Sequence, residues 1–258
     1  MDRFQQLFSR YGTWNSIRTS VRYPSSVLLR FYRDIIRKDE KLLAGFLGTE
    51  VVEVENYFGD LYKERIFFKT IESCQVLLER APVRGGLIDK REAAIIYAIA
   101  RHEKVERAVE TGVASGLSTA HLLLAMDHNG KGRLTSIDLP NTDAYKGDPR
   151  QMLPAGKPPG WIVPDHLKPR WTLLLGDARI KLPELMKQLT DPVDLFLHDS
   201  LHTYEHMMWE FETIWPHLRS GGILIADDAD SNGAIHDFCK KVGRRALIMD
   251  GLGIVQKK

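Results

Sequence analysis

Residues 89–258 alternate short apolar runs with helical patterns, and no other feature of the chain constrains its fold as strongly. The apolar runs predict strands at 107–111, 134–139, 171–175, 193–198 and 223–226, with helices at 89–101, 118–126, 180–189, 203–218 and 233–242. Two last runs, 245–249 and 253–257, flank Asp250 and Gly251 and predict a closing hairpin. Strands joined by helices in this order favour right-handed crossovers. The expected fold is therefore α/β, with a mainly parallel seven-stranded sheet and an antiparallel edge hairpin.

Residues 1–88 have a different pattern. Apolar residues three or four apart predict helices at 26–38 and 64–80. Pro82, Gly85 and Gly86 then mark a boundary. We expect an N-terminal helical extension, 1–88, followed by a second domain, 89–258.

The first 38 residues are basic and rich in aromatic side chains. They hold eight Arg and Lys against two Asp, so they carry +6, whereas the net charge of the whole chain is +2. Arginines among aromatics fit peripheral contact with a membrane surface, an anionic partner or nucleic acid. Solvated helix faces with packed aromatics are the favoured interpretation, and we expect no nucleic-acid partner.

Several classes of protein are disfavoured by composition. With 43% hydrophobic and 27% charged residues the chain is typical of a globular protein, and its apolar runs are too short for a membrane span. Arg3, Arg10 and Arg18 interrupt any signal-peptide core, so the expected compartment is cytoplasmic. Cys74 and Cys239 belong to no metal motif and are predicted to be reduced thiols.

Residues 140–169 hold seven of the twelve prolines, which disfavours regular structure over most of this segment. A loop of this length in a compact domain is often a lid. Trp161, Ile162 and Val163 give it apolar groups to pack with, so a lid is our interpretation.

Acidic residues and glycines recur where the predicted strands end. In a parallel sheet, ligands bind beyond the carboxyl ends of the strands. The first strand ends in ExGxxxG, from Glu110 to Gly116, rather than the GxGxxG of dinucleotide folds. Asp138 follows and can accept two hydrogen bonds from a ribose diol. Acids around such a loop favour a cationic nucleoside, and S-adenosylmethionine (SAM), a sulfonium, has that charge.

The motifs VETGVASGLST, SIDLP, LLGDA, DLFLHDSLHTYE and GGILIADDAD together resemble class I SAM-dependent methyltransferases, over about residues 89–258. They are most similar to the small-molecule and sugar O-methyltransferases of methyltransferase family 24, which have a Rossmann-like fold. The resemblance implies a methionine pocket at Glu110, Gly112 and Gly116, ribose binding by Asp138, and adenine near Asp177 and Ala178. The full set of predicted donor-site residues is Glu110, Thr111, Gly112, Ser115, Gly116, Ser118, Asp138, Gly176, Asp177, Ala178 and Asp199.

The resemblance also implies chemistry around HDSLHTYE. In metal-dependent sugar O-methyltransferases the positions of Asp199, Asp227 and Asp228 hold a divalent cation, and the histidine at the position of His202 takes the substrate proton. Clustered carboxylates need a cation to stay ionised, and oxygen ligands select Mg²⁺, Ca²⁺ or Mn²⁺ over zinc. We therefore expect Asp199 and His202 to be catalytic, with Mg²⁺ as an optional cofactor.

Structural alternatives stand beside these assignments. Asp227 and Asp228 could cap the next helix, and His202 could merely cap, or pack at, the start of the helix that follows it. A zinc site made of His198, His202 and His206 fails if His198 ends a strand. Asp230 lies near the same strand end and could replace Asp227 or Asp228 as a ligand. Ser200 stands where a glycine is common in the family. Glu205 and Glu210 are predicted to face solvent, and the predicted core residues of this segment are Trp209, Phe211 and Trp215.

The sequence thus predicts an enzyme, a SAM-dependent methyltransferase acting on a hydroxyl of a small molecule or sugar. The alternatives are a non-catalytic SAM-binding or scaffold protein and an NAD(P)-dependent oxidoreductase. A homo-oligomer is expected because an apolar helical N-terminal segment often serves as a dimer arm.

Overall fold

The computed structural model describes residues 38–79, 90–140, 153 and 156–258. The chain divides into two units, 1–41 and 42–258, and the second contains the whole sheet. Nearly all of the predicted basic segment and of the 26–38 helix lies outside the described residues. The same is true of Asp89, of the boundary at Pro82 and of much of the proline-rich segment.

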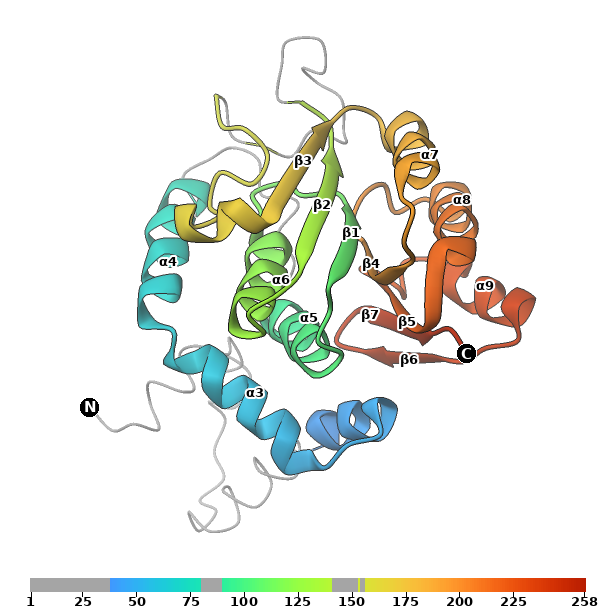
Figure 1. Cartoon of the computed structure of the whole chain (residues 1–258), viewed down its shortest axis with the longest axis horizontal. Coiled ribbons are helices and arrows are strands. Elements are labelled where there is room, and N and C mark those ends of the chain that lie inside the picture. The colour runs from blue at the N-terminus through green and yellow to red at the C-terminus, as the bar shows by residue number, and fades with distance from the viewer. Residues whose placement is uncertain (1–37, 80–89, 141–152, 154–155) are drawn as a thin grey trace, which may run out of the picture. The chain divides into compact units, whose positions relative to one another are not determined.

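The unit 42–258 is built on one seven-stranded sheet with the order β3-β2-β1-β4-β5-β7-β6 (Figure 1). Its strands are β1 (Arg107–Thr111), β2 (Arg133–Asp138), β3 (Trp171–Leu175), β4 (Val193–His198), β5 (Leu218–Ala226), β6 (Ala246–Met249) and β7 (Leu252–Gln256). The first five strands pair in parallel, and β7 is antiparallel to both β5 and β6. The predicted sheet and its edge hairpin are confirmed, with strand ends within one residue except for β5, which begins five residues early.

Helices cover both faces of the sheet. They are α3 (Val51–Lys63), α4 (Arg65–Glu79), α5 (Lys90–His102), α6 (Leu117–His128), α7 (Ala178–Gln188), α8 (Tyr204–Ile214) and α9 (Ala234–Val242), with short 3₁₀ helices η3 (Asp165–Arg170) and η4 (Trp215–His217). Figure 1 shows α7, α8 and α9 on one side of the sheet and α5 and α6 on the other. No helix in the described parts of the chain has both the length and the apolar character needed to cross a bilayer.

Two hydrophobic clusters form because side chains alternate along each strand. On β4, Leu195 and Leu197 join the cluster under α5 and α6, whereas Phe196 joins the cluster under α8 and α9. Helix α6 is buried from Leu117 to Met126, which explains its nearly continuous apolar sequence. This packing holds the strand ends, and the loops that follow them, in a rigid frame.

Helices α3 and α4, which the sequence places in an N-terminal extension, contribute to the same core as the sheet. Leu61 of α3 and Phe67 of α4 are buried in the cluster under α5 and α6. The ring of Phe67 meets His121 of α6 edge to face, with ring centroids 5.0 Å apart. Cys74 and Cys239 are free thiols, as predicted.

Candidate active site

The loops after β1 and β4 lie side by side because these two strands are neighbours in the sheet. Asp199 N donates to Thr111 O at 2.8 Å, and Asp227 N donates to His198 O at 2.9 Å. The helices that follow the two strands, α6 and α8, pack in different clusters, so the sheet has its topological switch point here. The register therefore brings the strand ends with predicted site residues to one edge of the sheet.

Gly112 and Gly116 are required by contacts within the chain. Gly112 has φ +81°, and a Cβ there would lie 1.7 Å from the carbonyl oxygen of Asp199. Gly116 has φ +97°, and its Cβ would lie 2.7 Å from the Cα of Gly160. Gly160 N also donates to Ala114 O at 2.9 Å, so part of the predicted lid packs directly on this loop. The sequence pointed to a ligand as the reason for these glycines, and the structure adds this packing within the chain.

Asp138 binds the backbone of the glycine loop. Its Oδ2 accepts hydrogen bonds from Val113 N at 3.1 Å and Ala114 N at 2.8 Å, and its Oδ1 accepts one from Leu139 N at 2.7 Å. Burial raises the pKa of Asp138, although these amides oppose that effect. The carboxylate predicted to bind ribose thus also shapes the loop beside it.

Glu110 is fully buried beneath the glycine loop. Its Oε1 accepts from Ser118 Oγ at 2.7 Å, and its Oε2 accepts from Thr119 Oγ1 at 2.8 Å and Ser136 Oγ at 2.6 Å. Burial raises the pKa of Glu110 to about 7, against the three hydroxyl bonds. Glu110 and Ser118, both predicted donor-site residues, are therefore bonded to each other in the floor of the site.

Other predicted donor-site residues also have structural partners. Thr111 and Ser115 have buried side chains, and Ser115 O accepts from Ile162 N at 3.2 Å. Asp177 is the N-cap of α7 and accepts from Arg179 N at 2.9 Å. Gly176 N donates to Asp138 O at 2.9 Å, which places the end of β3 next to the end of β2.

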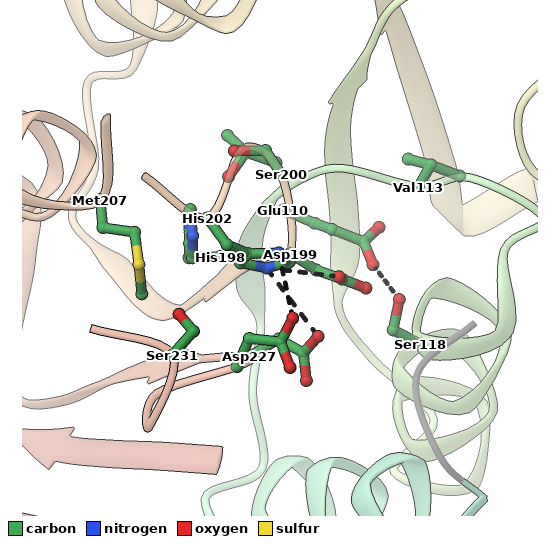
Figure 2. A network of polar contacts seen from close by, with 12 residues as sticks. Glu110, Val113, Ser118, His198, Asp199, Ser200, His202, Met207, Asp227 and Ser231 are labelled. Atoms are coloured by element: carbon green, nitrogen blue, oxygen red, sulfur yellow. Dashed lines mark hydrogen bonds and ion pairs between the residues drawn. The ribbon is translucent and has the colours of Figure 1, made fainter. Parts of the chain in front are cut away.

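His202 lies beside Asp199 and Asp227 at the ends of β4 and β5 (Figure 2), and Asp228 faces it as well. Its Nε2 lies 4.0 Å from Asp199 Oδ1 and 3.9 Å from Asp227 Oδ2, and its Nδ1 lies 3.3 Å from Asp228 Oδ2. One ligand atom each from Asp199, His202 and Asp227 lie within 4.8 Å of one another. Asp228 is turned to the other ring nitrogen, and its side chain is 60% exposed.

The acids at this site have raised pKa values. Burial, and then the charge of Asp227, raise the pKa of Asp199 well above its ordinary value. Burial and the charge of Asp228 likewise raise the pKa of Asp227. Burial, followed by the neighbouring His198, lowers the pKa of His202 to about 4. His202 is therefore neutral near pH 7, and its buried Nε2 has no hydrogen-bond partner among the described residues.

The capping alternatives are wrong. Thr203, and not His202, is the N-cap of α8, with its Oγ1 accepting from His206 N at 3.4 Å. Helix α9 begins at Ala234 after Gly233, well beyond Asp227 and Asp228. Since β4 ends at His198, the three histidines spaced by four do not share a helix, and the zinc alternative fails as expected.

The prediction that Glu210 faces solvent is wrong, because this side chain is fully buried. The helical period of α8 could have revealed that Glu210 is buried. The buried face of this helix consists of His206, Met207, Glu210, Phe211 and Ile214. Glu205 is exposed, as predicted. Phe211 is a core residue and Trp209 and Trp215 pack against the same cluster, also as predicted.

Asn232 is a second residue that sequence reasoning missed. Its Nδ2 donates to His202 O at 3.1 Å, and its Oδ1 accepts from Ala234 N at 2.9 Å. It therefore connects the loop that carries His202 to the loop that carries Asp227. A lone Asn in a polar loop gives no sequence signal for this role.

A family model agrees with this geometry. The model of a methyltransferase domain, family 24, matches residues 109–229, which span the glycine loop and the acid cluster. Residues 109–229 form a methyltransferase domain. The match supports the predicted class I SAM-dependent methyltransferase, and the Rossmann-like fold is confirmed.

Solved structures share the fold of this methyltransferase domain. An O-methyltransferase from Bacillus cereus in complex with SAH matches with 16% identity and a TM-score of 0.55, covering 73% of this chain and 91% of that chain. An O-methyltransferase from Streptomyces achromogenes involved in tomaymycin synthesis, in complex with SAM, matches with 14% identity and a TM-score of 0.54, over 76% and 91%. An SAH-bound Podospora anserina methyltransferase has 14% identity and a TM-score of 0.53, over 73% and 87%. No curated protein sequence matches the chain.

Proposed function

We propose that this methyltransferase transfers the methyl group of SAM to a hydroxyl of a small molecule or sugar. The observation that carries the proposal is the arrangement of His202. Its Nδ1 faces Asp228, while its buried Nε2, beside Asp199 and Asp227, has no hydrogen-bond partner within the described part of the chain. An acid that holds one ring nitrogen leaves the other as a proton acceptor, which is the logic of a general base.

The donor site of the proposal lies over the loop from Gly112 to Gly116. Backbone groups of this loop, the carboxylate of Asp138 and the end of β3 at Asp177 surround the place where a nucleoside binds in a sheet of this topology. Glu110, Thr111, Ser115 and Ser118 support that loop from below through their buried side chains. The matching structures contain SAH or SAM, which supports a donor of this chemical class.

The methyl group moves from the sulfur of SAM to the acceptor oxygen as that oxygen loses its proton. His202 Nε2 takes the hydroxyl proton, the oxygen forms a bond to the methyl carbon, and the carbon–sulfur bond breaks to leave S-adenosylhomocysteine. Asp199 and Asp227 would hold a divalent cation, because two carboxylates this close together supply the oxygen ligands that Mg²⁺ and Mn²⁺ prefer. When bound, such a cation lowers the pKa of the acceptor hydroxyl.

The experiment is a methyl-transfer assay against phenols, sugars and other hydroxyl compounds, together with calorimetric SAH binding. We expect SAH binding and transfer to at least one hydroxyl acceptor. SAH binding without transfer to any acceptor would indicate a non-catalytic binding protein, and no SAH binding at all would reject the proposal.

Cation binding has its own test. Thermal unfolding with Mn²⁺ at about 100 times its dissociation constant should stabilise the wild-type protein by about 2.7 kcal/mol. Asp227→Asn should lose this stabilisation. The control Asp230→Asn changes an exposed acid of the same loop and should keep it. Equal stabilisation in both variants would reject the assignment of Asp227. The acceptor, the oligomeric state and the compartment stay predictions of the sequence.

A further inference from the structure

Glu210 on α8 is a fully buried carboxylate whose two oxygens meet four polar side chains. Its Oε2 accepts from Thr111 Oγ1 at 2.5 Å and lies 2.6 Å from His198 Nδ1. Its Oε1 accepts from Ser200 Oγ at 2.9 Å and lies 2.9 Å from His206 Nε2. Burying a charge costs desolvation energy, and hydrogen bonds from these four partners offset that cost.

The charge state of Glu210 defines the direction of each bond. Burial alone raises the pKa of Glu210, but the charges of His198 and His206 and their hydrogen bonds hold the pKa far below its ordinary value. An ionised carboxylate only accepts hydrogen bonds. His198 Nδ1 and His206 Nε2 therefore each carry a hydrogen directed at Glu210, and the hydroxyls of Thr111 and Ser200 donate to it as well.

The partners of Glu210 bracket the loop that carries the proposed base. His198 and Ser200 flank Asp199, and His206 lies in the first turn of α8, immediately after the loop 199–203. Thr111 links the same carboxylate to β1, whose last carbonyl accepts from Asp199 N at 2.8 Å. One side chain thus holds both ends of the loop.

His198 connects Glu210 to His202. The two imidazole rings meet edge to face, with centroids 5.2 Å apart and an interplanar angle of 86°. His198 is fully buried, so its ring has no room to turn without moving its neighbour. The hydrogen bond from His198 Nδ1 to Glu210 therefore also restrains the ring of His202.

We propose that Glu210 is a positioning residue for methyl transfer, which holds the loop 199–203 so that His202 and Asp199 face the reacting oxygen. This inference rests on the proposed function. It predicts that loss of the Glu210 carboxylate impairs the chemical step far more than donor binding, because three of its four partners, His198, Ser200 and His206, flank or belong to the loop 199–203, and Thr111 alone of the four belongs to the donor site.

The decisive variant is Glu210→Gln, which keeps the shape but replaces one acceptor oxygen with a donor. We expect SAH affinity within about threefold of wild type, kcat reduced by about 10- to 100-fold as for other supporting residues, and little change in the acceptor KM. Crystal structures with SAH should show residues 199–203 displaced in the variant. The matched control is Glu205→Gln, an exposed acid on the same helix, which should behave as wild type.

Wild-type kcat and an unchanged loop in Glu210→Gln would overturn the positioning role. If that variant does not fold, Ser200→Ala decides the question, because it removes a single hydroxyl partner on the loop. We then expect a smaller loss of kcat with unchanged SAH affinity, and unchanged kcat would overturn the proposal. A wild-type chain that fails to bind SAH would instead reject the proposed function. If the wild-type chain binds SAH but methylates no acceptor, the loop position in the two crystal structures decides.

Discussion

The acids at the ends of β1 and β2 differ from those at the ends of β4 and β5. Glu110 and Asp138 accept three hydrogen bonds each from hydroxyls or amides of the protein. Asp199 and Asp227 instead face His202 across gaps of 4.0 and 3.9 Å. Glu110 and Asp138, whose oxygens accept hydrogen bonds from the protein, stabilise the loop of the proposed SAM site. Asp199 and Asp227, which face a neutral imidazole, remain available for a cation or a substrate. Acids that occupy similar positions in the sequence, at strand ends, therefore have two different roles: supporting a loop and facing the proposed base.

The largest effect is expected at Gly112, where the loop after β1 contacts the loop after β4. Gly112→Ala should abolish SAH binding and prevent stable folding, because the new Cβ would overlap the Asp199 carbonyl at 1.7 Å and φ is +81°. Gly59→Ala is the control, since no atom of the described residues lies within 4 Å of where a Cβ on this helical glycine would be. Circular dichroism and SAH calorimetry measure both. A well-folded Gly112→Ala protein with normal SAH affinity would show that the two loops do not depend on this close contact.

His202→Ala tests the β4 and β5 side alone. We expect kcat to fall by about 10²- to 10⁴-fold, the range for loss of a general base, while SAH affinity stays near wild type. His166→Ala, at an exposed histidine of η3, should keep full activity. Initial rates and SAH calorimetry separate the two effects. Full activity in His202→Ala would leave that side without its proposed base.

Glu110→Gln tests the acid on β1 through the pH dependence of the free energy of unfolding. The pKa of Glu110 is about 7 when folded, against 4.5 for the unconstrained group. Between these values the folded state binds more protons than the unfolded state, so the free energy of unfolding falls as pH rises, by about 3 kcal/mol at most. The variant should lose this slope, whereas Glu106→Gln, at an exposed acid, should retain it. Urea unfolding at pH 5 and pH 7 measures the difference, and identical slopes in wild type and Glu110→Gln would contradict the burial effect.

Asp177 should give the smallest effect. Asp177→Ala removes the N-cap of α7 and should lower the free energy of unfolding by about 1 kcal/mol, whereas Asp177→Asn keeps a capping oxygen and should be near wild type. If Asp177 also contacts the donor, both variants will weaken SAH binding. Thermal unfolding and calorimetry together separate capping from binding, and equal stability of the two variants would argue against the cap.

Much of the fold follows from periodicity. Alternating apolar and helical segments predicted all seven strands and the edge hairpin, because each segment carries its own local pattern. The motifs also located the strand-end acids, since a parallel sheet brings its carboxyl ends to one edge. The burial of Glu210 was not predicted, because acidic side chains generally prefer the surface. Its position in the helical period of α8 was the one sequence signal for burial.

From the sequence alone, the motifs showed a resemblance to methyltransferases, and the periodicity placed acids and a histidine at the ends of predicted strands, because both signals are local along the chain. Only the tertiary structure decided which acids are bonded to several protein donors and which are open. That distinction depends on which residues from β1, α6 and α8 meet in space. Ser118, Ser136 and Thr119 close around Glu110, whereas no comparable set of donors meets Asp227 among the described residues, and no local pattern records such contacts between distant segments.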